Sequence, residues 1–107
     1  MNRNRRWQVL HGEELVGIAC LTDHDAGMNV WLGVFEPARY YQEIQEVFQG
    51  FADAEDDPER VAKYYVERDS LNLSILDEEG VEMRGTVHLV DFNKEEPGTE
   101  IEVVIFP

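Results

Sequence analysis

Between residues 30 and 51 the spacing of apolar residues passes directly from that of a strand to that of a helix, and this is the one place in the sequence where it does so. They first alternate on two faces, at Val30, Trp31, Leu32, Gly33, Val34 and Phe35. This pattern predicts a strand with apolar groups on both sides, which is typical of the inside of a sheet. They then recur at helical spacing, at Tyr40, Tyr41, Ile44, Val47, Phe48 and Phe51. At the junction, we expect Glu36 to cap a helix and Pro37 to lie in its first turn.

The residues before this segment predict a hairpin. Two short apolar runs, 7–11 and 15–22, are separated by Gly12-Glu13-Glu14, which has the composition of a turn. The second run also has apolar residues on both faces, so we expect it to lie inside the sheet.

The second half of the chain predicts one more helix and three strands. Asp57 followed by Pro58 is typical of a helix start, and the helix should run over about 58–69. Strand periodicity then appears in residues 71–75, 81–89 and 101–105, and Gly85 suggests a bulge within the second of these runs.

Together these elements predict an α+β fold in the order β-β-β-α-α-β-β-β. Because strands and helices are grouped and do not alternate, we expect an antiparallel sheet of five to six strands with two helices packed on one face. Residues 7–107 should form a single domain, preceded by a basic flexible arm over residues 1–6.

Composition narrows the class of protein. Nine Lys and Arg against 23 Asp and Glu give a net charge of −14. Since phosphate contacts supply much of the affinity for nucleic acids, this charge disfavours a nucleic-acid partner. The chain also lacks an apolar run of about 18 residues and a signal-peptide core, and it has one cysteine, Cys20. We therefore expect a cytoplasmic protein that does not contact a membrane.

Candidate metal ligands are few. His24 lies between Asp23 and Asp25 in a turn-rich segment, and a cluster of this kind could hold a metal. Zinc needs three or four ligands, however, and a solvated surface turn explains the same residues. The sequence therefore predicts no metal and no cofactor, and these three residues are the candidates if a metal does bind.

Candidate binding residues lie around the strand-to-helix junction: Trp31, Glu36, Tyr40 and Tyr41. Adjacent tyrosines cannot both point into one core, so one of Tyr40 and Tyr41 should be buried and the other partly exposed. The pair Tyr64 and Tyr65 should behave in the same way. Exposed tyrosines among acidic residues suit a protein interface, although packing at the edge of the core explains them equally well.

The same junction carries a resemblance. The motif W-L-x-x-F-E-P, followed by an aromatic-bearing helix, resembles a family of small uncharacterised bacterial proteins. The matching residues are Trp31, Leu32, Phe35, Glu36, Pro37, Tyr41, Val47 and Phe48, with similar stretches over 55–57 and 71–80. This family has no activity that the resemblance could imply for the chain.

These observations favour a small acidic interaction domain without catalysis, which binds a protein partner or associates with itself as a homodimer. The alternative is a small metal- or ligand-binding protein, or a hydrolase, with a site built from His, Asp and Glu. A concave pocket that gathers Trp31, Glu36 and a histidine would favour the alternative.

Overall fold

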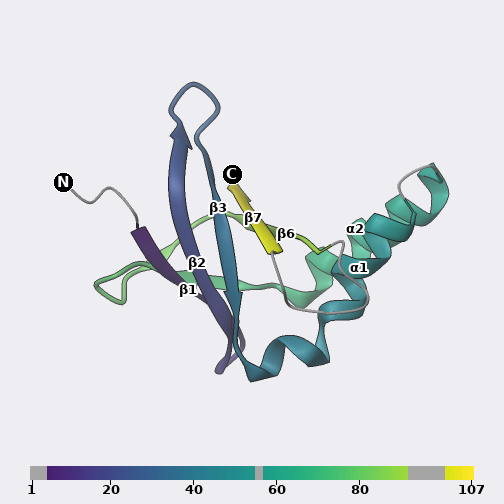
Figure 1. Ribbon diagram of the computed structural model, residues 1–107, viewed down its shortest axis with the longest axis horizontal. Coiled ribbons are helices and arrows are strands. Elements are labelled where there is room, and N and C mark those ends of the chain that lie inside the picture. The colour runs from purple at the N-terminus through teal and green to yellow at the C-terminus, as the bar shows by residue number, and fades with distance from the viewer. Residues whose placement is uncertain (1–4, 55–56, 92–100) are drawn as a thin grey trace.

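The computed structural model describes residues 5–54, 57–91 and 101–107, with the backbone alone described for residues 51–53. Figure 1 shows a sheet with two helices lying to one side of it. The elements are β1 (Arg5–His11), β2 (Glu14–Asp25), β3 (Val30–Pro37), the 3-10 helix η1 (Arg39–Glu43), α1 (Gln45–Asp53), α2 (Pro58–Leu71), β4 (Ser74–Leu76), β5 (Glu82–Met83), β6 (Thr86–Val90) and β7 (Ile101–Phe106).

The described strands form one sheet of seven in the order β5-β4-β1-β2-β3-β7-β6, and all neighbours are antiparallel. The predicted hairpin is confirmed, because β1 pairs with β2. The expectation that β3 lies inside the sheet is also confirmed, because it pairs with β2 on one side and β7 on the other.

The sheet is curled into a half-barrel. Its two edge strands, β5 and β6, are joined in the chain by Arg84 and Gly85 alone. In a flat sheet these edges would be about 29 Å apart, because neighbouring strands are spaced by about 4.8 Å. The backbone from Met83 to Thr86 can span only about 11 Å. The sheet must therefore bend until its edges approach, with a concave inner side and a convex outer side.

The predicted count of five to six strands is wrong, and Gly85 explains why. The predicted single strand over 81–89 divides at this residue, so that β5 pairs with β4 while β6 pairs with β7. Gly85 has φ +156°, and a Cβ added there would lie 3.1 Å from Ile105 and 3.6 Å from Ile75. A glycine is needed because the chain turns a corner between side chains of β7 and β4, the strands next to the two edges.

The prediction of two helices packed on one face of the sheet is also wrong. The inner face of the half-barrel is filled by side chains of the strands themselves, together with Tyr41, Ile44 and Phe48 from the chain that follows β3. Helix α1 contacts the edge strand β6, and α2 lies against α1 (Figure 1). Their close approach requires Gly50 within α1, where an added Cβ would collide with the ring of Tyr64.

The first helix begins later than predicted. Pro37 still belongs to β3 and is paired with Gly17, and the next amide, Ala38 N–H, donates to the carbonyl of Val16 at 2.8 Å. Glu36 is therefore a strand residue and not a helix cap. The hydrogen-bonded ladder between β2 and β3 continues past Pro37, which has no N–H, because the bond to β2 is donated by the N–H of Ala38.

The predicted start of the second helix is confirmed. Asp57 Oδ1 accepts from the backbone N–H groups of Glu59 at 3.1 Å and Arg60 at 3.3 Å, and Pro58 lies in the first turn. The helix runs two residues further than predicted and ends at Leu71, before Asn72 in the left-handed region at φ 51°.

The first strand of the domain begins earlier than predicted. Arg5 and Arg6, placed in the flexible arm by the sequence, are the first residues of β1 and pair with Leu21 and Cys20. Residues 1–4 of that arm lie outside the described residues. Within the described part of the chain, no helix is both long and apolar enough to cross a membrane.

Candidate functional site

Apolar side chains on the outer face of β3 are open to solvent. Leu32 is 39% exposed and Val34 is 51% exposed. The register places Val34 between Cys20 of β2 and Glu102 of β7, and it places Leu32 beside Val104 of β7. Adding Ile18, the next outward residue of β2, we call this set the outer strip: Ile18, Cys20, Leu32, Val34 and Val104. Three neighbouring strands thus present one continuous apolar surface on the convex side of the half-barrel.

Charged groups border the outer strip. Arg6 lies opposite Cys20, and its Nη2 donates to Glu36 Oε2 at 2.8 Å while its Nη1 donates to Cys20 Sγ at 3.3 Å. The hydrogen bond and charge of Arg6 lower the pKa of Glu36. Burial, and then the charge of Glu36, raise the pKa of the Cys20 thiol. This thiol therefore remains protonated at neutral pH and is a poor nucleophile.

Trp31 lies on the other face of β3, among aromatic rings. Its ring is stacked on His24 with centroids 3.9 Å apart and is tilted against Trp7 at 5.0 Å. Glu78 accepts from Trp7 Nε1 at 2.8 Å and from Arg5 Nη1 at 2.9 Å. The structure thus brings a histidine to Trp31, but it places Glu36 on the opposite face of the strand. The pocket that would have favoured a catalytic site is not formed by these three residues.

Two of the three candidate metal ligands, His24 and Asp25, make hydrogen bonds to the turn that connects β2 to β3, while Asp23 is paired with Leu32 of β3. Asp25 Oδ1 accepts from the backbone N–H groups of Gly27 at 3.1 Å and Met28 at 3.2 Å. His24 Nε2 lies 3.1 Å from Asn29 Oδ1, and all these residues are exposed. Across the described residues, no three His, Cys, Asp or Glu side chains are placed to hold a metal ion together.

Tyr40 and Tyr41 have different surroundings, as the sequence predicted. Tyr40 is half-buried, and its hydroxyl lies 2.8 Å from His11 Nδ1. Tyr41 is 1% exposed and donates to Asp91 Oδ2 at 2.9 Å. Burial, and then the bond to Asp91, raise the pKa of Tyr41. Tyr41 is therefore a core residue and is inaccessible to a ligand.

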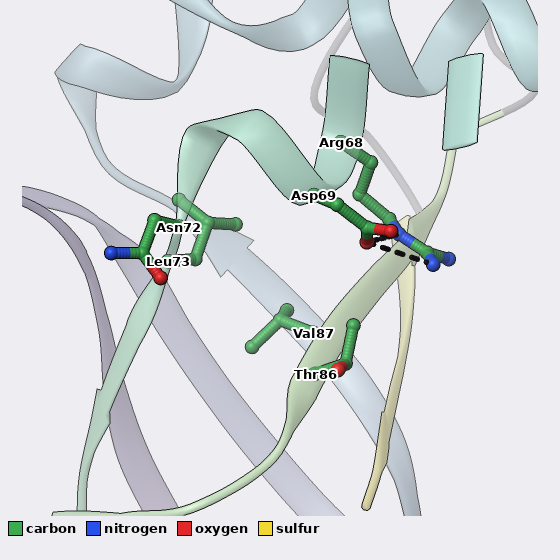
Figure 2. Close-up of a pocket in the computed structure, with 6 residues that line it drawn as sticks. All are labelled: Arg68, Asp69, Asn72, Leu73, Thr86 and Val87. Atoms are coloured by element: carbon green, nitrogen blue, oxygen red, sulfur yellow. Dashed lines mark hydrogen bonds and ion pairs between the residues drawn. The ribbon is translucent and has the colours of Figure 1, made fainter. Parts of the chain in front are cut away.

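A pocket of about 190 Å³ lies where the end of α2 meets β6. Figure 2 shows the six residues that line it: Arg68, Asp69, Asn72, Leu73, Thr86 and Val87. This volume is below the roughly 300 Å³ at which small-molecule sites begin. The pocket is polar on the side of Arg68 and Asp69 and apolar at Leu73 and Val87.

Arg68 fixes the end of α2 to the strands beside this pocket. Its side chain is 9% exposed, and Asp69 Oδ1 accepts from its Nε at 3.2 Å and its Nη2 at 3.1 Å. Its guanidinium carbon lies 4.8 Å from the Tyr65 ring centroid and 5.5 Å from that of Phe106. The buried cation is thus held by a carboxylate and two aromatic faces.

His88 completes this cluster in its neutral form. Arg68 Nη1 lies 3.1 Å from His88 Nδ1, and because arginine can only donate, that nitrogen must accept. Burial, and then the charge of Arg68, lower the pKa of His88 to about 4. Nδ1, the nitrogen that could act as a base, therefore already accepts a hydrogen bond from Arg68. This bond supports a structural role for the cluster beside the pocket.

Sequence reasoning missed both the outer strip and the buried arginine. Leu32 and Val34 were identified as apolar strand residues, but the pattern could not indicate that their face would remain uncovered. Arg68 is in helical phase with Tyr64 and Leu71, both half-buried, and this phase was the available signal for its burial. A charged residue at that position predicts a surface side chain unless its partners are known.

Comparison with known proteins gives no match to a family model, to a curated protein or to a solved structure. The resemblance based on Trp31 to Phe48 therefore stays a prediction.

Proposed function

We propose that this chain is a protein-binding domain and that the outer strip is its binding surface. The observation that carries the proposal is the exposure of Leu32 and Val34, 39% and 51%, side by side on a central strand. On the inner face of the same strand, Phe35 is 2% exposed, and its partners on the neighbouring strands, Ala19 and Ile101, are fully buried. Contiguous exposed apolar surface with a polar border is a feature of protein interfaces.

The partner in this proposal is a different protein. Two copies of the chain would each bring a net charge of −14, which disfavours their association. A partner with a less acidic surface avoids this cost.

The proposal is tested by site-specific photo-cross-linking of the full chain in its native cells. A photoreactive residue at Val34 should give discrete protein adducts, and these should disappear when Leu32→Glu is added. Val81 is the matched control, because it is 55% exposed against 51% for Val34 but lies outside the strip. Adducts that are equal at the two positions, or that survive Leu32→Glu, would contradict the proposal.

A further inference from the structure

The charges around the outer strip are mostly negative. Glu102 lies directly beside Val34 on β7, and Asp23 of β2 is paired with Leu32. The nearby cation, Arg6, is already bonded to Glu36 on the same face. Asp23 and Glu102 therefore leave a net negative border on both sides of the apolar surface. A partner that covers it gains by placing cations beside these two carboxylates.

The dimensions of the strip match those of one helix. It is three strands wide, and the outer two are about 10 Å apart, which is about the diameter of an α-helix with its side chains. Its length along β3, from the level of Leu32 to that of Ile18, which is paired with Glu36, is about 13 Å. A helix of about nine residues covers that length, and one of about 14 residues also reaches past both ends. Apolar sheet faces are commonly buried by helices in this way.

We infer that the outer strip binds an amphipathic helix of a basic partner protein. Its apolar side packs on Leu32 and Val34, and Lys or Arg residues flanking that side lie beside Asp23 and Glu102. This inference rests on the proposed function and adds the chemistry of the partner.

Three synthetic peptides test the inference against the full chain. Each has about 14 residues and the same leucine face, flanked by Lys in the first peptide, by Gln in the second and by Glu in the third. Binding is measured by fluorescence anisotropy at low and at moderate salt. We expect the order Lys, Gln, Glu in affinity, with the Lys peptide losing its advantage as salt rises.

Two pairs of matched variants separate specific binding from general attraction of a basic peptide to an acidic protein. Val34→Glu and Val81→Glu add the same charge at similar exposure. Val34→Glu should weaken the Lys peptide about tenfold, because an apolar contact is lost, and Val81→Glu should not weaken it. Glu102→Gln should weaken the Lys peptide about threefold and Glu82→Gln should leave it unchanged. Leu32→Gln serves as a second variant if Val34→Glu fails to fold by circular dichroism.

The outcomes distinguish the inference from the proposed function. If the Gln peptide binds as tightly as the Lys peptide and both depend on Val34, the surface binds helices but the basic partner is refuted. Equal effects of Val34→Glu and Val81→Glu would refute binding of the helix at the strip. A dimer in sedimentation that Val34→Glu dissociates would identify a second copy as the occupant and overturn the inference. If Val34 cross-links to a partner that has no basic helix, the proposed function is supported and only the inference is overturned.

Discussion

The two faces of β3 carry similar residues and have opposite surroundings. Phe35 points inward and is 2% exposed, whereas its neighbour Val34 points outward and is 51% exposed. Inside, Phe35 meets Tyr41 edge-on with ring centroids 5.7 Å apart. Outside, Val34 lies between Cys20 and Glu102 on the convex surface. The inner face therefore maintains the fold, while the proposed binding surface on the outer face lies outside the core.

The largest expected difference between the faces is in their response to truncation. Phe35→Ala should lower the free energy of unfolding by about 3 to 5 kcal/mol, because it opens a cavity beneath Tyr41. Val34→Ala should change it by less than about 0.5 kcal/mol. Urea unfolding followed by tryptophan fluorescence measures both. Similar losses for the two variants would show that the outer face is buried within the chain in solution.

A second prediction concerns the contact between β2 and β3. A Cβ at Gly33 would collide with the carbonyl oxygen of Cys20 and lie 2.7 Å from Leu21 Cα. Gly33→Ala should therefore cost about 3 kcal/mol, since backbone atoms cannot move aside as a side-chain end can. Gly27→Ala is the control, because the nearest atom to its added Cβ is 3.4 Å away. A stable Gly33→Ala protein would mean that the two strands can separate at the bulge between Leu21 and Asp23.

A smaller effect is expected at the end of the inner face, where Tyr41 donates to Asp91. Tyr41→Phe removes a hydrogen bond to a carboxylate that is 1% exposed, and the loss should be about 1.5 to 3 kcal/mol. Tyr40→Phe removes a bond in a less buried setting and should cost less than about 1 kcal/mol. Thermal unfolding of the two variants gives the comparison, and a reversed order would refute the burial of this bond.

A further prediction concerns the pH dependence of stability and His88. Its pKa is lowered from an ordinary 6.5 to about 4 by burial and by Arg68. As the pH falls through 6.5, the unfolded chain takes up a proton at this residue and the folded chain does not, so stability falls between pH 6.5 and about 4.

His88→Gln keeps an acceptor for Arg68 but cannot titrate, so its stability should fall less steeply between about pH 7 and about pH 5. His24→Gln leaves His88 in place and should therefore retain the steep dependence of the parent. Parallel slopes for His88→Gln and the parent protein would show that His88 does not titrate differently on folding.

Local features of the fold were predictable because neighbouring residues decide them. The cap formed by Asp57, the hairpin of β1 and β2 and the central position of β3 follow from turn chemistry and apolar spacing. The division of the predicted strand 81–89 was not predictable in the same way. Gly85 marked an irregularity there, but only pairing with β4 and β7, distant in sequence, decides that the strand forms two edges.

The candidate site shows the same limit. Trp31, Glu36, Tyr40 and Tyr41 are close in the sequence, yet they lie in four different settings. Strand alternation alone separates Trp31 from Glu36, since residues five positions apart point to opposite faces. By contrast, the outer strip joins residues of three strands, and no local pattern contains it.

The sequence by itself determined which residues of this protein are apolar, where α2 begins, which two runs form the β1–β2 hairpin, and how acidic it is. Those properties depend on side-chain chemistry and on contacts a few residues apart. Only the tertiary structure decided that the sheet curls, that Arg68 is buried between Tyr65 and Phe106, and that Leu32 and Val34 remain exposed. Curling depends on which strands meet at the edges, and the curl determines which of the two apolar faces of β3 the chain can bury.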